Sequence, residues 1–477
     1  MKRAAAVLAV LAAGASIAAG IDRSRPPEPG PPRAVVLPEV QRRTLPNGLT
    51  VLVVEQHEVP TVQVSLLVAA GAAADPKDRP GVAAMTADLL DEGAGTRGAL
   101  ELADVLDGLG AQVSTGAGWD SASAGAHVPV KHLAQTLPLL ADIVLRPRFE
   151  PAELDRLRTE ALTAILQQRD DPEELAAAAW PRAVFGEHRY ATPATGDARS
   201  IAALTVEDVR RFHGQHYRPG NATLLIVGDV TPAVVDLATQ AFGAWPAGGT
   251  RPLALPVPRA VKERRLWLID RPKAAQSVVR IGQVAPDRHV RHYHALEVAN
   301  TLLGGLFTSR LNDNLRETHG YAYGANSRIE YRRVGGTFRA AANVQTPSTA
   351  PALTEMLKEL RRIVTPAPPD EIARARSYLA MSYPQQFETP AQIASQLAQQ
   401  IVYELPPDEF ESYVPKTMAV GVTEAARAAA DTLRPEQMAV VVVGDRAVIE
   451  APLRALNLGT WRIVTTDEVL GPPPKLD

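Results

Sequence analysis

The sequence contains no cysteine among its 477 residues. No disulfide can form, no lipid can be attached to a mature N-terminal cysteine, and stability must come from packing alone. The chain also lacks an excess of charge of either sign, because 50 Lys and Arg residues stand against 53 Asp and Glu residues, for a formal net charge of -3. Without a basic face, nucleic acid is not an expected partner, and long-range steering of ligands should be weak.

The chain has enough apolar residues for a sizeable folded core. Hydrophobic residues make up 46% and charged residues 22% of the sequence, which is typical of a globular protein and not of a disordered or membrane-embedded one. Single cores stop growing at roughly 250 to 300 residues. A chain of this length should therefore divide into two or more domains.

Residues 1–20 have the pattern of a secretory signal peptide. Lys2 and Arg3 precede a run rich in Ala, Val and Leu, which ends in the small residues 18–20. Cleavage there predicts an exported protein, located in the periplasm or outside the cell, with no membrane span after processing. A retained membrane anchor is the alternative, but the run is short for the about 20 apolar residues that a span needs.

Two proline-rich stretches divide the remaining chain. Residues 21–38 contain five prolines between positions 26 and 32, which excludes a helix and predicts a tether. Residues 246–262 combine prolines with Gly248 and Gly249 and predict a linker. The expected parts are then an N-terminal domain at 39–245, a C-terminal domain at 263–466 and a tail at 467–477.

The two halves look like copies of one another. Residues 217–229 run from Tyr-Arg-Pro through an apolar stretch to Gly-Asp, and residues 433–445 run from Leu-Arg-Pro to Gly-Asp in the same way. The offset between Gly228 and Gly444 is 216 residues, which indicates an internal repeat. Each half also opens with two strand patterns, at 49–54 and 62–68 in the first half and at 266–269 and 278–281 in the second.

Helical patterns lie between the strands of the first half. Apolar residues recur there at spacings of three and four, at 81–90, 100–109, 133–145 and 151–168. Strands that are grouped, and flanked by amphipathic helices, predict an α+β fold. We expect two similar domains, each a mainly antiparallel sheet packed with helices, arranged as a clam shell.

The segment 81–93 reads Gly-Val-Ala-Ala-Met-Thr-Ala-Asp-Leu-Leu-Asp-Glu-Gly. It resembles the signature helix of the pitrilysin and mitochondrial-processing-peptidase family, whose active members carry an inverted zinc motif, H-x-x-E-H. In that motif two histidines on one helical face bind zinc, and the glutamate is a general base. The matching positions here are Ala84, Ala87 and Asp88. Alanine has neither a lone pair nor a proton acceptor, so this helix is expected neither to hold zinc nor to activate its water.

The resemblance places a third zinc ligand, a glutamate, on a later helix that ends in an Asp-Asp-Pro turn. This chain keeps the turn at 170–172, but Thr163 and Ala164 stand where the carboxylates are expected. All positions of the zinc site have therefore changed. We expect this chain to bind no cofactor, and we expect Asp88 to be a solvated or capping carboxylate.

The ten histidines offer a poor alternative metal site. Three of them, His289, His292 and His294, form the one cluster in the sequence, and no cysteine completes a ligand set. Arg288 and Arg291 would in addition repel a cation.

The second half carries a further signature at 304–323, which reads Gly-Gly-Leu-Phe-Thr-Ser-Arg-Leu-Asn-Asp-Asn-Leu-Arg-Glu-Thr-His-Gly-Tyr-Ala-Tyr. It resembles the family's C-terminal signature, G-G-x-F-x-S-R-L followed by L-R-E-x-x-G-x-A-Y. The resemblance implies that Arg316 and Tyr323 bind the substrate backbone and help to stabilise the oxyanion. A guanidinium and a phenol both donate directed hydrogen bonds, which suits that role. The alternative is that Arg316 pairs with Glu317 or another carboxylate, and that Tyr323 packs in a strand after Gly320.

These features predict the non-catalytic subunit of a heteromeric zinc metallopeptidase. This chain would supply Arg316 and Tyr323 to a site shared with a homologous subunit that carries H-x-x-E-H and the zinc. Extended peptides would bind by addition to an exposed sheet edge. One alternative is a structural or peptide-holding homodimer without peptidase activity. An autonomous enzyme with a rebuilt metal site is disfavoured by the lack of cysteine and the poor histidine cluster.

Overall fold

The computed structural model describes residues 30–249, 254–259, 261 and 263–474. The predicted signal peptide lies outside these residues, as do parts of the predicted tether, linker and tail. Residues Ala34–Asp477 form one compact unit. None of the helices in the described part of the chain combines the length and the apolar character that crossing a membrane requires.

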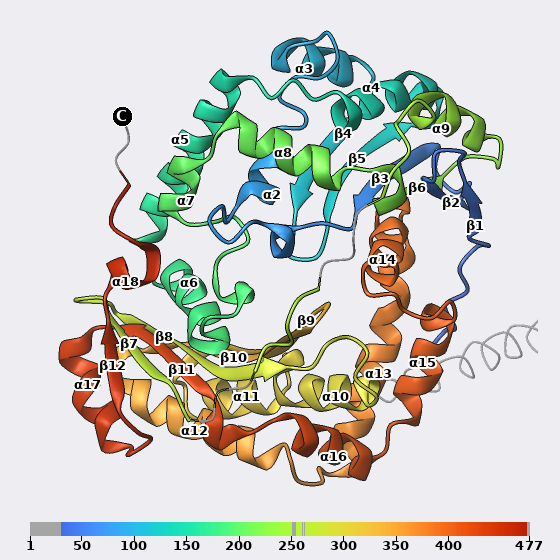
Figure 1. Ribbon diagram of the computed structural model, residues 1–477. Coiled ribbons are helices and arrows are strands. Elements are labelled where there is room, and N and C mark those ends of the chain that lie inside the picture. The colour runs from blue at the N-terminus through green and yellow to red at the C-terminus, as the bar shows by residue number, and fades with distance from the viewer. Residues whose placement is uncertain (1–29, 250–253, 260, 262, 475–477) are drawn as a thin grey trace, which may run out of the picture. The chain divides into compact units, whose positions relative to one another are not determined.

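Each half of the unit is built on one mixed six-stranded sheet (Figure 1). The first sheet has the order β1-β2-β6-β3-β5-β4, with β1 Gln41–Thr44, β2 Thr50–Glu55, β3 Thr61–Val68, β4 Gln112–Ala117, β5 Ala122–Pro129 and β6 Ala222–Gly228. The second has the order β12-β7-β11-β8-β10-β9, with β7 Leu266–Asp270, β8 Gln276–Ala285, β9 Ala322–Arg332, β10 Gly335–Gln345, β11 Ala439–Gly444 and β12 Trp461–Val464.

The strand pairing reproduces the repeat that the sequence predicts. In the first sheet β2 runs parallel to β6, and β3 is antiparallel to both β6 and β5. In the second sheet β7, β11, β8 and β10 repeat this arrangement. The halves differ at one edge, where β1 pairs antiparallel with β2 but β12 pairs parallel with β7. The two strands predicted at the start of each half are therefore confirmed, as β2 and β3 in the first half and β7 and β8 in the second.

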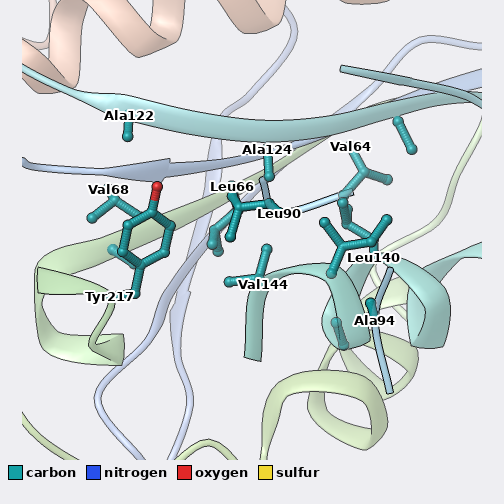
Figure 2. Close-up of a cluster of buried hydrophobic side chains, with 14 of the residues drawn as sticks. Val64, Leu66, Val68, Leu90, Ala94, Ala122, Ala124, Leu140, Val144 and Tyr217 are labelled. Atoms are coloured by element: carbon teal, nitrogen blue, oxygen red, sulfur yellow. The ribbon is translucent and has the colours of Figure 1, made fainter. Parts of the chain in front are cut away.

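The helices of the first half, with the exception of α6, cover one face of its sheet. The helices of this half are α2 Val82–Asp88, α3 Ala99–Gly108, α4 Leu133–Leu145, α5 Pro151–Gln168, α6 Pro172–Phe185, α7 Ala198–Ala203, α8 Val206–His216 and α9 Val234–Phe242, and the first four confirm the predicted helices. Alternate strand residues such as Val64 and Leu66 pack against Leu140 and Val144 of α4 in a buried core (Figure 2). Tyr217 closes one end of this cluster, with its ring among the aliphatic side chains.

The second half repeats this layering. Its helices are α10 Tyr293–Asn300, α11 Arg310–Asn312, α12 Thr349–Arg362, α13 Pro369–Ser382, α14 Pro390–Val402, α15 Glu409–Ala419, α16 Val422–Thr432, α17 Arg446–Ala455 and α18 Thr466–Leu470. The segment predicted as a tail thus begins within α18, whose Val469 and Leu470 are buried against α6 and the second sheet. These two apolar side chains hold the start of that segment to the fold.

Each half contributes one helix to the sheet of the other half. α6 of the first half packs on β8 and β11, where Leu175 shares a buried cluster with Val441. α14 of the second half packs on β3 and β6, where Leu397 shares a cluster with Leu225 (Figure 1). Separating the halves would expose both apolar surfaces to water, so the exchange of helices stabilises the closed pair.

The tips of two hairpins meet where the halves join. The Asp120 carboxylate, in the turn between β4 and β5, accepts a hydrogen bond of 3.0 Å from the backbone N–H of Arg333. It accepts another, of 3.2 Å, from the Tyr190 hydroxyl. The Arg332 guanidinium lies 4.7 Å from the ring centre of Trp119 and 4.6 Å from that of Tyr190. Charge and aromatic stacking together fix the two turns against each other.

Candidate functional site

The segment before α2 is held by a buried carboxylate. Asp75 accepts hydrogen bonds from the backbone N–H groups of Gly81, at 2.7 Å, and Ala83, at 2.9 Å, so that it caps the N-terminus of α2. The Arg189 guanidinium donates a third, of 2.7 Å. Burial raises the pKa of Asp75 to about 6, against the opposing effect of these donors.

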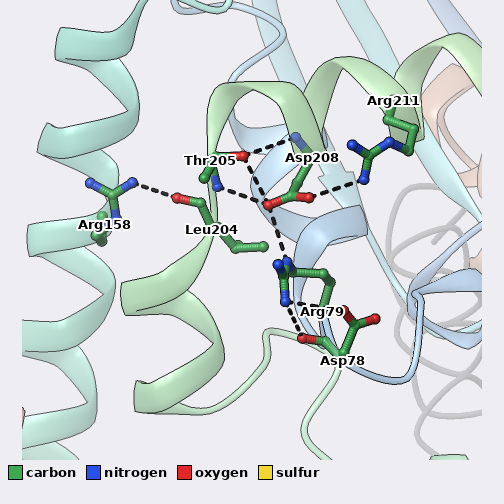
Figure 3. Close-up of polar contacts among 7 residues, drawn as sticks. All are labelled: Asp78, Arg79, Arg158, Leu204, Thr205, Asp208 and Arg211. Carbon is green, nitrogen blue, oxygen red and sulfur yellow. Dashed lines mark hydrogen bonds and ion pairs between the residues drawn. The ribbon is translucent and has the colours of Figure 1, made fainter.

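A second polar network ties the same segment to α8 and joins α5 to the start of α8 (Figure 3). The Asp208 carboxylate accepts hydrogen bonds from Arg79, at 3.2 Å, and from the backbone N–H of Thr205, which begins α8. Arg158 of α5 donates to the backbone carbonyl of Leu204 at 2.7 Å. α2 is therefore rigidly placed, although its family signature is altered.

The altered positions on α2 carry no zinc-binding chemistry. Ala84 and Ala87 are buried. Asp88 is accessible to solvent, but the protein atoms around it, together with nearby Asp91, raise the pKa of its carboxyl to about 6. On α5 the Thr163 hydroxyl donates to the Thr159 carbonyl at 2.7 Å.

The next residue on α5, Ala164, is exposed. Within the described residues, no group of three or more His, Cys, Asp or Glu side chains is placed to hold a metal ion. The residues present at the family's zinc positions therefore do not fit the metal.

The second signature lies on backbone that departs from regular geometry at three places. Gly304 and Gly305 end a π-helical turn, η5 (Thr301–Gly305), and Arg316 lies in a second one, η6 (Asp313–Thr318). Near the start of β9, Tyr323 and Gly324 together oppose a single residue of β10, which is a β-bulge. π-Helical turns and β-bulges both recur at functional sites, where they redirect side chains.

The bulge places Tyr323 beside Arg316. The guanidinium carbon of Arg316 lies 5.1 Å from the ring centre of Tyr323 and 4.6 Å from that of Phe307. Both rings are largely in solvent, with exposed fractions of 86% for Tyr323 and 66% for Phe307. Arg316 also forms the predicted ion pair with Glu317, at 3.3 Å, but this pair is exposed and contributes little. The alternative drawn from the sequence, that Tyr323 packs in a strand, does not fit the structure, because its side chain is exposed.

One buried side chain joins the two parts of this signature. The Asn312 amide oxygen accepts a hydrogen bond of 2.7 Å from the backbone N–H of Ala325, next to the bulge. The Asn312 amide nitrogen donates to the Leu306 carbonyl at 3.4 Å. Asn312 and Phe307 were not identified as site residues from the sequence, although both lie inside the quoted signature. The bond from Ala325 to Asn312 lies beside the bulge, which no sequence pattern revealed.

The three clustered histidines do not face a common point. His292 is hydrogen-bonded to the hydroxyl of Thr432, and His294 to the hydroxyl of Thr417. Burial, followed by repulsion from Arg288 and Lys416, lowers the pKa of His294 to about 4. His294 is thus a neutral packing residue near pH 7.

The fold and the two signature segments define a two-domain α+β protein of the peptidase type. Residues 50–198 match the family model described as insulinase (peptidase family M16), and residues 203–379 match the model described as the peptidase M16 inactive domain. An uncharacterized zinc protease of Mycobacterium bovis is 32% identical over 308 residues, which is 63% of this chain and 69% of that protein. The chain belongs to peptidase family M16, and the predicted resemblance is confirmed.

Solved structures agree with the fold. A crystal structure described as the peptidase M16 inactive domain from Pseudomonas fluorescens superposes with a TM-score of 0.81 at 27% identity, covering 85% of this chain and 98% of that one. The periplasmic protease PqqL from Escherichia coli has a TM-score of 0.72 at 16% identity, covering 91% of this chain and 52% of PqqL. The predicted α+β fold of two similar domains is confirmed.

Proposed function

We propose that this chain is the non-catalytic subunit of a heteromeric zinc peptidase and that it provides Arg316 and Tyr323 to a site shared with a homologous subunit. One observation carries the proposal. The Arg316 and Tyr323 side chains are stacked and solvent-accessible on backbone that is shaped for them, whereas the zinc positions hold Ala84, Ala87 and Asp88. The partner is expected to carry H-x-x-E-H and the zinc ion.

Two comparisons support this assignment. The model that residues 203–379 match and the Pseudomonas structure are both described as an inactive M16 domain. The chain matches about half of PqqL, and the first half of PqqL has also been solved by itself and matches this chain. The fold of this chain therefore corresponds in length to about one half of that protease. That protease is periplasmic, which agrees with the export we propose from the signal pattern at 1–20.

Arg316 and Tyr323 can act on a peptide through hydrogen bonds alone. The guanidinium is permanently charged and can donate to peptide carbonyls, and the Tyr323 phenol can donate one directed bond. A donor aimed at a developing oxyanion is stronger where water is excluded. Because Tyr323 is mostly exposed in the isolated chain, closure by the partner or by the peptide would complete that environment.

Each sheet has an edge strand to which an extended peptide would add. β4 lies at the edge of the first sheet and β9 at the edge of the second. An extended peptide that adds to such an edge bonds through its backbone, which gives broad specificity.

The second candidate function is a structural or peptide-holding homodimer. It shares the fold and the altered zinc positions but requires no zinc-bearing partner. The mature chain, tagged and purified from its native envelope fraction, separates the two functions. We expect an M16 homologue with H-x-x-E-H in equal amount, with about one zinc ion per pair. Recovery of this chain alone and free of metal would instead favour the structural or peptide-holding function.

A further inference from the structure

Three arginines lie side by side on the face of the second sheet that is turned toward α6. Arg339 of β10 is directly opposite Arg328 of β9. Arg280 of β8 is opposite Ala341, two residues along β10 from Arg339. Residues that oppose each other, or that are two apart, share a face of a sheet. Arg328, Arg339 and Arg280 therefore form one row across three strands, here called the arginine row.

The strand β9, which carries Arg328, also lines a cavity farther along its length. Glu330 and Arg332 follow Arg328 at intervals of two along β9, and both line a cavity of about 780 Å³. The first sheet, the turn after β4, and α14 with the residue that follows it provide further polar lining, which comprises Gln63, Ser65, Ser114, Asp120, Ser121, Ser123, Ser395, Gln399 and Tyr403. Amides, hydroxyls, a guanidinium group and the carboxylates of Glu330 and Asp120 thus surround a space large enough for several residues of an extended peptide.

The arginines outnumber the carboxylates bound to them. Glu330 pairs with Arg328, and Glu173 pairs with Arg280 at 2.8 Å. With Arg332 and Arg339, and with Asp120 in the cavity lining, the surface carries four positive charges against three negative ones. Among the described residues, Nε of Arg280, Nε of Arg339 and Nη1 of Arg332 are buried without a hydrogen-bond partner.

This surplus of positive charge is energetically unfavourable in the free chain. Burial, and then repulsion from Arg280 and Arg328, lowers the pKa of Arg339 to about 10. Charges on an edge strand can serve simply to prevent edge-to-edge association. That explanation suits Arg328, whose side chain is 55% exposed. It does not suit Arg280, which is 7% exposed on the internal strand β8.

We propose that the arginine row and Arg332 form a binding surface for an acidic, extended peptide segment that enters the cavity. Carboxylates would offset the surplus charge and accept charge-assisted hydrogen bonds from the accessible guanidinium of Arg328. This surface is separate from the Arg316 and Tyr323 pair and does not depend on a zinc-bearing partner. The isolated chain, without a partner, should therefore prefer acidic peptides.

The test measures binding of fluorescent hexaglutamate and hexaglutamine peptides, both amidated at the C-terminus, to the full mature chain at low salt. We expect hexaglutamate to bind at least about tenfold more tightly, with an affinity that falls as salt rises. Arg328→Gln should weaken its binding by about tenfold, since it removes a charge-assisted hydrogen bond to a glutamate of the peptide. Arg328→Glu should weaken it further.

Two control variants make the outcome specific. Arg427→Gln removes an exposed arginine of α16 that pairs only with Asp431 among the described residues, and it should leave the affinity unchanged. Arg454→Gln, which removes an arginine of α17 that pairs with Glu450, should leave it unchanged as well. Equal binding of the two peptides, or equal losses in Arg328→Gln and Arg427→Gln, would overturn the proposal. Tight binding of hexaglutamine with a free C-terminal carboxylate would overturn the assignment to acidic side chains.

Discussion

The Arg316 guanidinium carbon lies 5.1 Å from the ring centre of Tyr323, although the residues belong to different elements. The chain between them turns at Gly320, whose φ of 64° lies in the left-handed region that glycine adopts without strain. The bulge in β9 then directs Tyr323 back over Arg316. The pair is thus built by the backbone and does not require a partner to form.

The first prediction concerns peptide cleavage by the assembled complex. Tyr323→Phe removes one hydrogen-bond donor and should lower kcat by about a hundred- to a thousandfold if that donor stabilises an oxyanion. Arg316→Ala should lower kcat/KM. The control is Tyr378→Phe, which alters a half-exposed tyrosine of α13 and should leave the kinetic constants unchanged. Wild-type kcat/KM in Arg316→Ala would contradict the role proposed for the arginine.

The second prediction concerns the buried amide that braces the bulge. Asn312→Ala leaves the Ala325 N–H without its acceptor, and a buried unpaired donor costs about 1 to 3 kcal/mol. The free energy of unfolding, measured by urea denaturation, should fall by that amount. Asn326→Ala, at an exposed position of the same strand, should change it by less than about 0.5 kcal/mol. Equal effects of the two substitutions would show that Asn312 does not support the bulge.

The third prediction concerns zinc. Ala84 and Ala87 offer no ligand atoms, and Asp88 has no partner ligand on α2, so the isolated mature chain should gain no stability from the metal. Its Tm in a thermal scan should be the same with equimolar zinc, with EDTA and with neither. A bound ligand at a hundred times its Kd would stabilise the fold by about 2.7 kcal/mol. A rise in Tm with one equivalent of zinc would therefore reveal a metal site.

The fourth prediction concerns acid. The pKa of His294 falls from 6.5 in the unfolded chain to about 4 in the fold, so the unfolded state binds the proton first between these values. This contribution to stability is complete above pH 6.5 and is lost as the pH falls toward 4. At pH 5 the loss is up to about 2 kcal/mol. Urea denaturation at pH 7 and pH 5 should show a smaller loss for His294→Gln than for the wild type.

The comparison with His294→Gln is needed because other groups act in the opposite direction. The pKa values of Asp75 and Asp88 are raised to about 6, so folding favours their protonated forms as the pH falls. Both effects are common to the wild type and the variant and cancel in the difference. Identical losses in the two proteins would mean that His294 keeps an ordinary pKa.

Local pattern was sufficient for much of the fold. The sequence was enough to predict the two opening strands of each half, the helices at 81–90 and 151–168, and the repeat. These features could be predicted because apolar spacing and turn residues act over a few neighbouring positions. The exchange of α6 and α14 could not be predicted. An apolar helical face indicates that it is buried but not which sheet buries it, and each of these helices crosses to the sheet of the other half.

The sequence by itself was enough to identify the family. It also showed that α2 lacks a zinc-binding histidine and the general-base glutamate, since Ala84 and Ala87 at those positions are read directly from it. Only the tertiary structure decided how the remaining polar groups meet. The bulge at Tyr323 and the register that aligns Arg280, Arg339 and Arg328 depend on pairing between strands that are distant along the chain. Such pairing is set by the packing of the whole sheet, and short-range sequence patterns do not encode it.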